Sequence, residues 1–242
     1  MLPGGMGTGD RTPRAMIARV RGRARRARRE DARDALGARL ALLNPEALAR
    51  ATGHPVILHR HLTAVGLPVP RLHGVVGRAG GWSAAGARPV IGRAQAARFL
   101  DGLTGDIRLQ PNGGAARVVR RGGGDDLDAV VAQLFAPDAA DLVVVQEWRG
   151  VGAPWRIVTA VGDDGVARVA HRWAAPDAEA DALARRAATA LMPQRALAWD
   201  IATSPDGPVV LAAEGRWADA PGLDAAAALA ALESALAVGA AA

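Results

Sequence analysis

The chain of 242 residues contains no cysteine, no tyrosine and no lysine. The absence of cysteine excludes disulfides, thiolate zinc sites and cysteine nucleophiles. The absence of lysine excludes Schiff-base chemistry and the lysine of a GxxxxGK phosphate-binding loop, and all 30 basic residues are arginine. No run of about 18 uncharged apolar residues occurs, so no membrane-spanning helix is predicted. Half of the residues are hydrophobic, which is typical of one large globular domain or two small ones.

The net charge of +6 comes from one segment of the chain. Residues 11–29 hold nine arginines and no acidic residue, so the remaining 21 arginines are outnumbered by 24 acidic residues. Few apolar residues accompany the arginines, and we therefore expect a helix over 13–43 that is solvated in its first half and packed in its second. Such an arm suits a phosphate polymer or an anionic membrane surface as its partner. A solvated charged helix without a ligand is the alternative.

In the rest of the chain, predicted strands alternate with predicted helices, and several strands pair as hairpins. Turn residues follow strand-like runs at 106–110, 155–161 and 196–203, and each turn leads into a second run. Helical patterns lie between them, and Asn44 is expected to cap a short helix that begins at Pro45. We expect an α+β fold with mostly antiparallel sheets. The expected division is a helical arm at 1–43, one α+β subdomain at 44–141 and a second at 142–242.

Five short motifs follow one another between residues 109 and 217 in a particular order. They are Leu109-Gln110-Pro111-Asn112-Gly113-Gly114, Val145-Gln146-Glu147, Trp155-Arg156-Ile157-Val158-Thr159, Trp199-Asp200-Ile201-Ala202 and Glu214-Gly215-Arg216-Trp217. In this order they resemble the motifs of ATP-grasp proteins, and most of all those of the branch associated with sugar transfer. The resemblance covers roughly residues 54–220. It implies two α+β subdomains that hold ATP between antiparallel sheets, with Mg²⁺ bridging the phosphates.

The resemblance implies a nucleotide-binding role for the first two motifs. Asn112, Gly113 and Gly114, at a hairpin tip, would close backbone amides over the phosphates. The strand that ends in Gln146 and Glu147 would offer backbone hydrogen bonds to adenine. A tight turn without a ligand is the structural alternative for the glycines.

The later motifs would supply the chemistry. Arg156 would be the catalytic guanidinium that faces phosphate or an acyl-phosphate transition state, with an ion pair to Glu147 as the structural alternative. Asp200 and Glu214 are hard oxygen ligands that suit Mg²⁺. If the turn at 204–207 sets a regular hairpin register, Asp200 lies opposite Leu211, and Glu214 falls on the other face of the sheet. We predict a one-residue shift that places both carboxylates on one face, pointing at Gln110 and Arg156.

Three positions depart from the family pattern. Gln110 stands where family members usually carry a phosphate-contacting lysine, and an amide cannot supply that charge. A second family lysine, near residue 60, is replaced at best by Arg60, which becomes the candidate nucleotide contact there. Arg216 replaces a neutral metal ligand, and a cation there repels Mg²⁺ unless its side chain points away.

These departures favour a diverged or non-catalytic relative of the ATP-dependent carboxylate–amine ligases, linked to cell-surface sugar or polymer biosynthesis. The alternative is an active ATP- and Mg²⁺-dependent ligase that forms an acyl phosphate and acts on a small molecule or a glycan precursor. A third interpretation is a nucleic-acid-binding protein that uses its arginine-rich arm. The chain is expected to be cytoplasmic.

Overall fold

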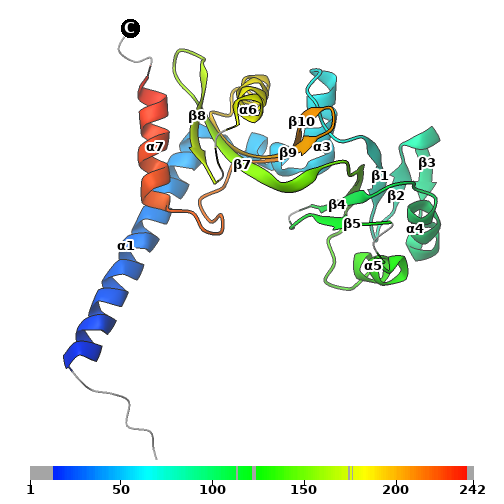
Figure 1. Ribbon diagram of the computed structural model, residues 1–242, viewed down its shortest axis with the longest axis horizontal. Helices are drawn as coiled ribbons and strands as arrows, with labels where there is room; N and C mark the ends of the chain where they lie inside the picture. The colour runs from blue at the N-terminus through cyan, green and yellow to red at the C-terminus, as the bar shows by residue number, and fades with distance from the viewer. Residues whose placement is uncertain (1–12, 113, 122–123, 174, 176, 239–242) are drawn as a thin grey trace, which may run out of the picture.

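A computed structural model describes residues 13–112, 114–121, 124–173, 175 and 177–238. Two sheets form its framework, and a long helix, α1, extends away from them (Figure 1). Within the described residues, no helix has both the length and the apolar character that crossing a bilayer requires. The expected α+β class, with mostly antiparallel sheets, is confirmed.

The first sheet has six strands in the order β3-β2-β1-β6-β4-β5. These are β1 (Leu72–Val76), β2 (Gly81–Ser83), β3 (Arg88–Val90), β4 (Ile107–Pro111), β5 (Arg117–Val119) and β6 (Val143–Glu147). Helices α4 (Gly92–Asp101) and α5 (Leu127–Leu134) pack on one face, around a core that includes Leu100, Ile107 and Val145. Because β6 pairs with β1 and β4, the change from one sheet to the other lies between β6 and the next strand, and not after residue 141 as expected.

The second sheet has four strands in the order β10-β9-β7-β8. They are β7 (Val151–Val161), β8 (Ala167–Arg172), β9 (Ala196–Ser204) and β10 (Gly207–Glu214). Figure 1 shows β7 as a long curved strand. The hairpins β4–β5, β7–β8 and β9–β10 are those that the turn residues predict.

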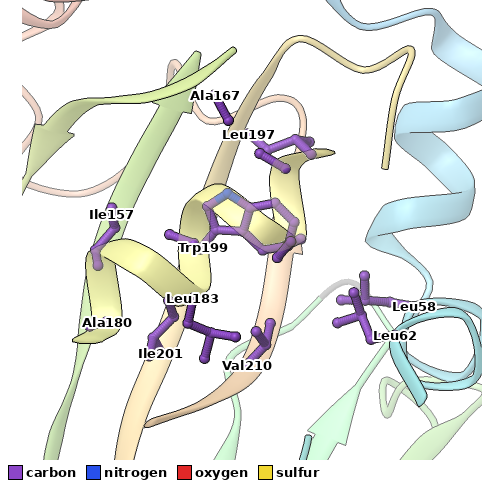
Figure 2. Close-up of a cluster of buried hydrophobic side chains, with 14 of the residues drawn as sticks. Leu58, Leu62, Ile157, Ala167, Ala180, Leu183, Leu197, Trp199, Ile201 and Val210 are labelled. Atoms are coloured by element: carbon purple, nitrogen blue, oxygen red, sulfur yellow. The ribbon is translucent and has the colours of Figure 1, made fainter. Parts of the chain in front are cut away.

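Helices cover both faces of the second sheet, so its strands are buried on two sides. Helices α3 (Pro55–Ala64) and α6 (Ala178–Ala190) pack on one face around Trp199. Figure 2 shows Trp199 among Leu183, Ile201 and other members of this core, and its indole N–H donates to Thr159 Oγ1 at 2.8 Å. Helices α1 (Pro13–Leu43) and α7 (Ala225–Ala237) pack on the other face.

The long helix α1 has the expected bounds and the expected division. Residues 17–31 are exposed, whereas Leu36, Leu40 and Leu43 are buried against the second sheet and α7. An ion pair between Arg39 and Glu233, with 2.6 Å between Nε and Oε1, joins the packed half to α7. Only the second half of α1 is therefore part of the globular body.

Asn44 does not cap α2 (Glu46–Gly53) as predicted, because Pro45 holds the N-cap position and no side chain caps it. Its Nδ2 instead donates to the carbonyl oxygens of Ala196, at 2.6 Å, and Gly215, at 2.8 Å. Its Oδ1 accepts from the backbone N–H groups of Arg195 and Ala196, both at 3.1 Å. Asn44 thus joins the end of α1 to the second sheet.

Candidate active site

A β-bulge in the β9–β10 hairpin decides which way Glu214 faces. Thr203 pairs with Pro208 and Ile201 with Val210, as a regular turn requires, but Asp200 then pairs with Ala212. Leu211 is the extra residue. Because Glu214 lies two residues beyond Ala212, it shares a face with Asp200. The predicted one-residue shift is confirmed.

Arg156 lies between these two carboxylates. It is the cross-strand partner of Asp200, and its Nε is 3.2 Å from Asp200 Oδ1. Its Nη2 donates to Glu214 Oε2 at 2.6 Å. The contact with Asp200 is electrostatic rather than an aligned hydrogen bond, because Nε has no hydrogen-bond partner. The alternative ion pair with Glu147 is not among the contacts of the described residues.

The ionisation of Glu214 depends on its burial and on the charges around it. Burial raises the pKa of Glu214; Arg156 opposes this, and the nearby carboxylates of Asp200 and Asp219 raise the pKa further. Burial is thus the largest cause of the shift in the pKa of Glu214.

Asp200 and Glu214, arranged in this way, do not fit a Mg²⁺ ion. Arg156 already neutralises both side chains, and Mg²⁺ needs near-octahedral oxygen coordination. Among the residues that the structure describes, no three histidine or acidic side chains come together to hold a metal. Arg216 points away toward α2, where its Nη2 lies 3.3 Å from Glu46 Oε1, so it does not repel a cation here. The metal role of the carboxylate pair stays a prediction that requires Arg156 to move.

Sequence reasoning missed Arg108, which lies two residues before Gln110 on β4 and shares its face. The Arg108 side chain is buried, with 4% of the residue exposed. Its Nη1 donates to Gln146 Oε1 at 2.8 Å, and its Nη2 to Gln110 Oε1 at 2.5 Å. Nη1 also lies 3.5 Å from the carbonyl oxygen of Leu211, the bulge residue of the other sheet. The alternation of Ile107, Arg108, Leu109 and Gln110 was the signal that could have found it.

Six side chains form two groups, one on each sheet, which together we call the inter-sheet site. Its members are Arg108, Gln110, Gln146, Arg156, Asp200 and Glu214. The long contact between Arg108 Nη1 and Leu211 O joins the two sheets there. The carboxylate pair meets Arg156 directly, as predicted. Gln110 belongs to the group on the first sheet through Arg108, and none of its described contacts joins it to the carboxylate pair.

Polar groups at the hairpin tip after β4 already form hydrogen bonds within the protein. Gln110 Nε2 donates to the carbonyl oxygens of Pro111, at 3.1 Å, and Gly114, at 3.0 Å. The backbone N–H of Asn112, an exposed residue, donates to Leu142 at 2.9 Å. Gly113 lies outside the described residues. The phosphate-covering role of Asn112, Gly113 and Gly114 stays a prediction.

The segment between β6 and β7, which links the two sheets, lines a cavity of about 290 Å³. This volume is at the small end of the range for ligand pockets. Glu147, Trp148, Pro68 and Val209 are among its walls. The backbone N–H of Glu147 donates to Arg71 O, and that of Trp148 to Asp106 O, both at 2.8 Å. These two amides are already engaged in hydrogen bonds, and the adenine-binding role of Gln146 and Glu147 stays a prediction.

Arg60 is exposed on α3, and its Cζ lies 5.4 Å from the centroid of the Trp82 ring on β2. None of its described interactions joins it to the inter-sheet site. Its nucleotide-binding role stays a prediction.

Two mostly antiparallel sheets, covered by helices and with polar side chains between them, define an α+β fold of two subdomains. Solved structures identify which fold this is. A RimK domain ATP-grasp protein from Sphaerobacter thermophilus is 21% identical with a TM-score of 0.50, over 77% of this chain and 68% of that one. This chain has the ATP-grasp fold, as the order of its motifs predicts.

Other similar structures are more distant in shape. The ATP-grasp ligase PsnB, with Mg and ADP bound, is 24% identical over 79% of this chain and 60% of its own, with a TM-score of 0.47. A D-alanine–D-alanine ligase from Bacillus anthracis is 14% identical over 76% of this chain and 67% of its own, with a TM-score of 0.48. No protein-family model and no curated protein matches the sequence.

Proposed function

We propose that this protein is a diverged, non-catalytic relative of the ATP-dependent carboxylate–amine ligases. The observation that carries the proposal is the position of Arg156, whose guanidinium contacts both Asp200 and Glu214. A cation held between the two predicted metal ligands competes directly with Mg²⁺ for them. A link to cell-surface sugar or polymer biosynthesis is part of the proposal and is supported by the order of the motifs.

The charges of the inter-sheet site support the same conclusion. Arg108 and Arg156 are balanced by Asp200 and Glu214, so the four side chains sum to zero. ATP-dependent ligation needs excess positive charge around the triphosphate, which metals and lysines usually provide. Here Gln110 stands in the place of the lysine, and Arg156 lies where the metal would bind.

The test is metal binding by the full chain, with Mn²⁺ as a spectroscopic substitute for Mg²⁺. We expect no tight Mn²⁺ binding by the wild type, as measured by the electron paramagnetic resonance signal of free Mn²⁺. Arg156→Gln should release Asp200 and Glu214 and increase Mn²⁺ affinity by about tenfold or more, because two unpaired neighbouring carboxylates attract a divalent ion.

Arg78→Gln is the matched control, because it removes an arginine that is paired with a single exposed carboxylate, that of Asp141. This variant should bind no more Mn²⁺ than the wild type. Tight binding of Mn²⁺ by the wild type, or release of ADP from Mg²⁺-ATP, would overturn the proposal in favour of an active ligase.

A second candidate function belongs to the arm, which we define as residues 11–31. Its part from residue 17 onward is exposed, and Arg26 with Glu30 forms the one ion pair described there. Arginines such as Arg19, Arg23 and Arg28 therefore keep their full charge for a polyanionic partner. Among residues 17–31 of the arm, the exposed large apolar side chains are Ile17 and Val20, which offer little surface to a membrane. We favour nucleic acid over lipid as its partner.

A further inference from the structure

The side of α1 that faces away from the body carries a continuous row of exposed residues, which we call the open stripe. Spacings of three and four residues place its members one above another along the helix. They are Ile17, Val20, Ala24, Ala27, Asp31, Asp34, Ala38 and Leu42, and all are exposed. Leu36, Leu40 and Leu43, which pack against the second sheet and α7, lie on the opposite side of the helix. The open stripe therefore runs uncovered along about 37 Å of helix.

The large apolar side chains of the open stripe lie at its two ends. Ile17 and Val20, at one end, are 50% and 62% exposed. Leu42, at the other end, is 78% exposed, the highest value for a large hydrophobic residue in the described chain. A single exposed leucine is common on protein surfaces, but apolar residues at both ends of one helical row indicate a surface that another helix covers.

The two halves of this helix carry opposite charge. Residues 17–29 include seven arginines and no acidic residue, whereas in residues 30–42 three acidic residues outnumber two arginines. The ion pairs described on α1 are those of Arg26 with Glu30 and of Arg39 with Glu233. Asp31 and Asp34, both on the open stripe, belong to neither pair. Each half of the helix is thus complementary in charge to the other half of a second, antiparallel copy.

We propose that a second copy of this chain covers the open stripe, with the two α1 helices paired antiparallel about a two-fold axis near residue 29. This pairing is isologous, because each copy uses the same surface. It brings Arg23 to about the level of the partner's Asp34, and Arg28 to about the level of the partner's Asp31. A parallel pair would set arginine against arginine over the first half of the helix, which is unfavourable.

The same arrangement covers the apolar ends of the open stripe. With the axis near residue 29, Ile17 of one copy lies beside Leu42 of the partner, and Val20 lies beside the partner's Ala38. Between them, the alanines at 24 and 27 let the two helices approach closely. Apolar contacts at both ends and ion pairs in the middle therefore come from a single alignment.

The body of each copy leaves room for this pairing. It packs on the side of α1 opposite the open stripe, and α1 extends away from the sheets (Figure 1). The two bodies thus lie on the outer sides of the helix pair, at opposite ends. Arg25 and Arg29 lie on the side of the helix opposite the open stripe, so they stay available to a polyanion. The inference goes beyond the proposed function, and neither depends on the other.

The experiment is sedimentation velocity of the full chain after nuclease treatment, from about 1 to about 100 μM protein at about 0.1 M salt. We expect a monomer–dimer equilibrium in the micromolar range that weakens as salt is raised, because salt screens exposed ion pairs. Asp31→Arg with Asp34→Arg should weaken the dimer about tenfold or more, since arginines then face the arginines of the partner. Both aspartates are exposed, so the melting temperature of this variant should stay near that of the wild type.

A mixing experiment tests whether the charges pair between copies. Arg23→Asp with Arg28→Asp should also weaken self-association, because acids then face acids. An equimolar mixture of the two double variants should form a heterodimer about as tight as the wild-type dimer, because opposite charges meet again at every pair. Asp138→Arg with Asp141→Arg is the matched control, since it reverses two exposed acids outside α1 and should leave the dimer unchanged.

Leu42→Ser tests the apolar contact separately and should weaken the dimer about tenfold without lowering the melting temperature, because Leu42 is exposed. The inference is overturned if the full chain is monomeric at about 100 μM, or if nuclease treatment abolishes the dimer. A dimer that survives Asp31→Arg with Asp34→Arg, or the deletion of residues 1–30, would place the interface elsewhere and overturn it too. Monomers that bind vesicles of phosphatidylcholine and phosphatidylserine would assign the open stripe to a membrane instead, and a mixture that stays monomeric would exclude the proposed charge pairs.

Discussion

The side chain of Asn44 orients the strand that carries Glu214, although it lies far away in the sequence. Its amide bonds the backbone of β9 and the carbonyl of Gly215, the residue after Glu214. Gly215 is closely surrounded, since a Cβ there would lie 3.2 Å from Ala49 Cβ and 3.4 Å from Gln194 Oε1. The end of β10 is therefore held by packing and hydrogen bonds, and these contacts fix the backbone position of Glu214.

Replacing Asn44 with alanine should lower the free energy of unfolding by about 2–4 kcal/mol. The variant leaves backbone groups of Ala196 and Gly215 buried with fewer partners, and each unsatisfied group costs about 1–3 kcal/mol. Urea denaturation followed by circular dichroism measures the change. Asn112→Ala removes an exposed asparagine and should stay within about 0.5 kcal/mol of the wild type. Equal effects of the two substitutions would contradict the role given to Asn44.

At the scale of elements, α1 combines two environments in one uninterrupted helix. Residues 17–31 are rich in arginine and exposed, and the second half of the helix packs Leu36 and Leu40 against the second sheet and α7. A charged helix without apolar contacts gains nothing from tertiary packing. Its first half is thus a feature of the surface, and its second half belongs to the core.

Deletion of residues 1–30 should change the melting temperature by less than about 2 °C, because no buried side chain of the described part is lost. The same deletion should abolish binding to a 20-base-pair DNA duplex, whose affinity for the full chain should fall steeply with salt. Fluorescence anisotropy measures the binding. Leu36→Ala gives the opposite pattern, with a loss of about 2–5 kcal/mol of stability and unchanged DNA binding. A large drop in melting temperature on deletion would show that the arm packs on the body.

Elements built from local signals could be predicted, and contacts between distant segments could not. The bounds of α1 and the three hairpins follow from neighbouring residues, and the structure has them all. The position of β6 depends on pairing with β1 and β4, which no neighbouring residue signals. For the same reason Arg108 was missed, since its partner Gln146 is 38 residues away. Asn44 resembles a helix cap in the sequence, because the residues it bonds are remote.

At the scale of the whole molecule, each sheet has its own hydrophobic core. Leu100 lies in the core under α4 and α5, whereas Leu183 lies in the core between α6 and the second sheet. The described polar contacts between the sheets are few, and the one at the inter-sheet site is the long contact between Arg108 and Leu211. Cores that share few contacts open independently.

Leu100→Ala should therefore loosen the first sheet alone. Amide hydrogen exchange, followed by mass spectrometry, should become faster in peptides from 72–147 and stay unchanged in peptides from 151–214. The local loss of stability should be about 2–5 kcal/mol. Leu183→Ala should give the reverse pattern. Faster exchange in both sheets of either variant would mean that the molecule unfolds as one cooperative unit.

The β9–β10 hairpin, which carries the bulge at Leu211, tolerates insertions and deletions at its turn better than at the end that carries Glu214. Before the bulge, Val210 is buried in the core and its N–H donates to Pro68 O at 2.9 Å; beyond it, Ala213 packs into the same core and Gly215 bonds to Asn44. Both sides of the bulge are therefore held by residues outside the turn, so we expect a residue gained or lost in the turn to leave Glu214 in place. Ser204 and Asp206, at the tip of this hairpin, line the 290 Å³ cavity. Insertions and deletions at the tip can thus change the wall of the cavity while the carboxylate pair keeps its orientation.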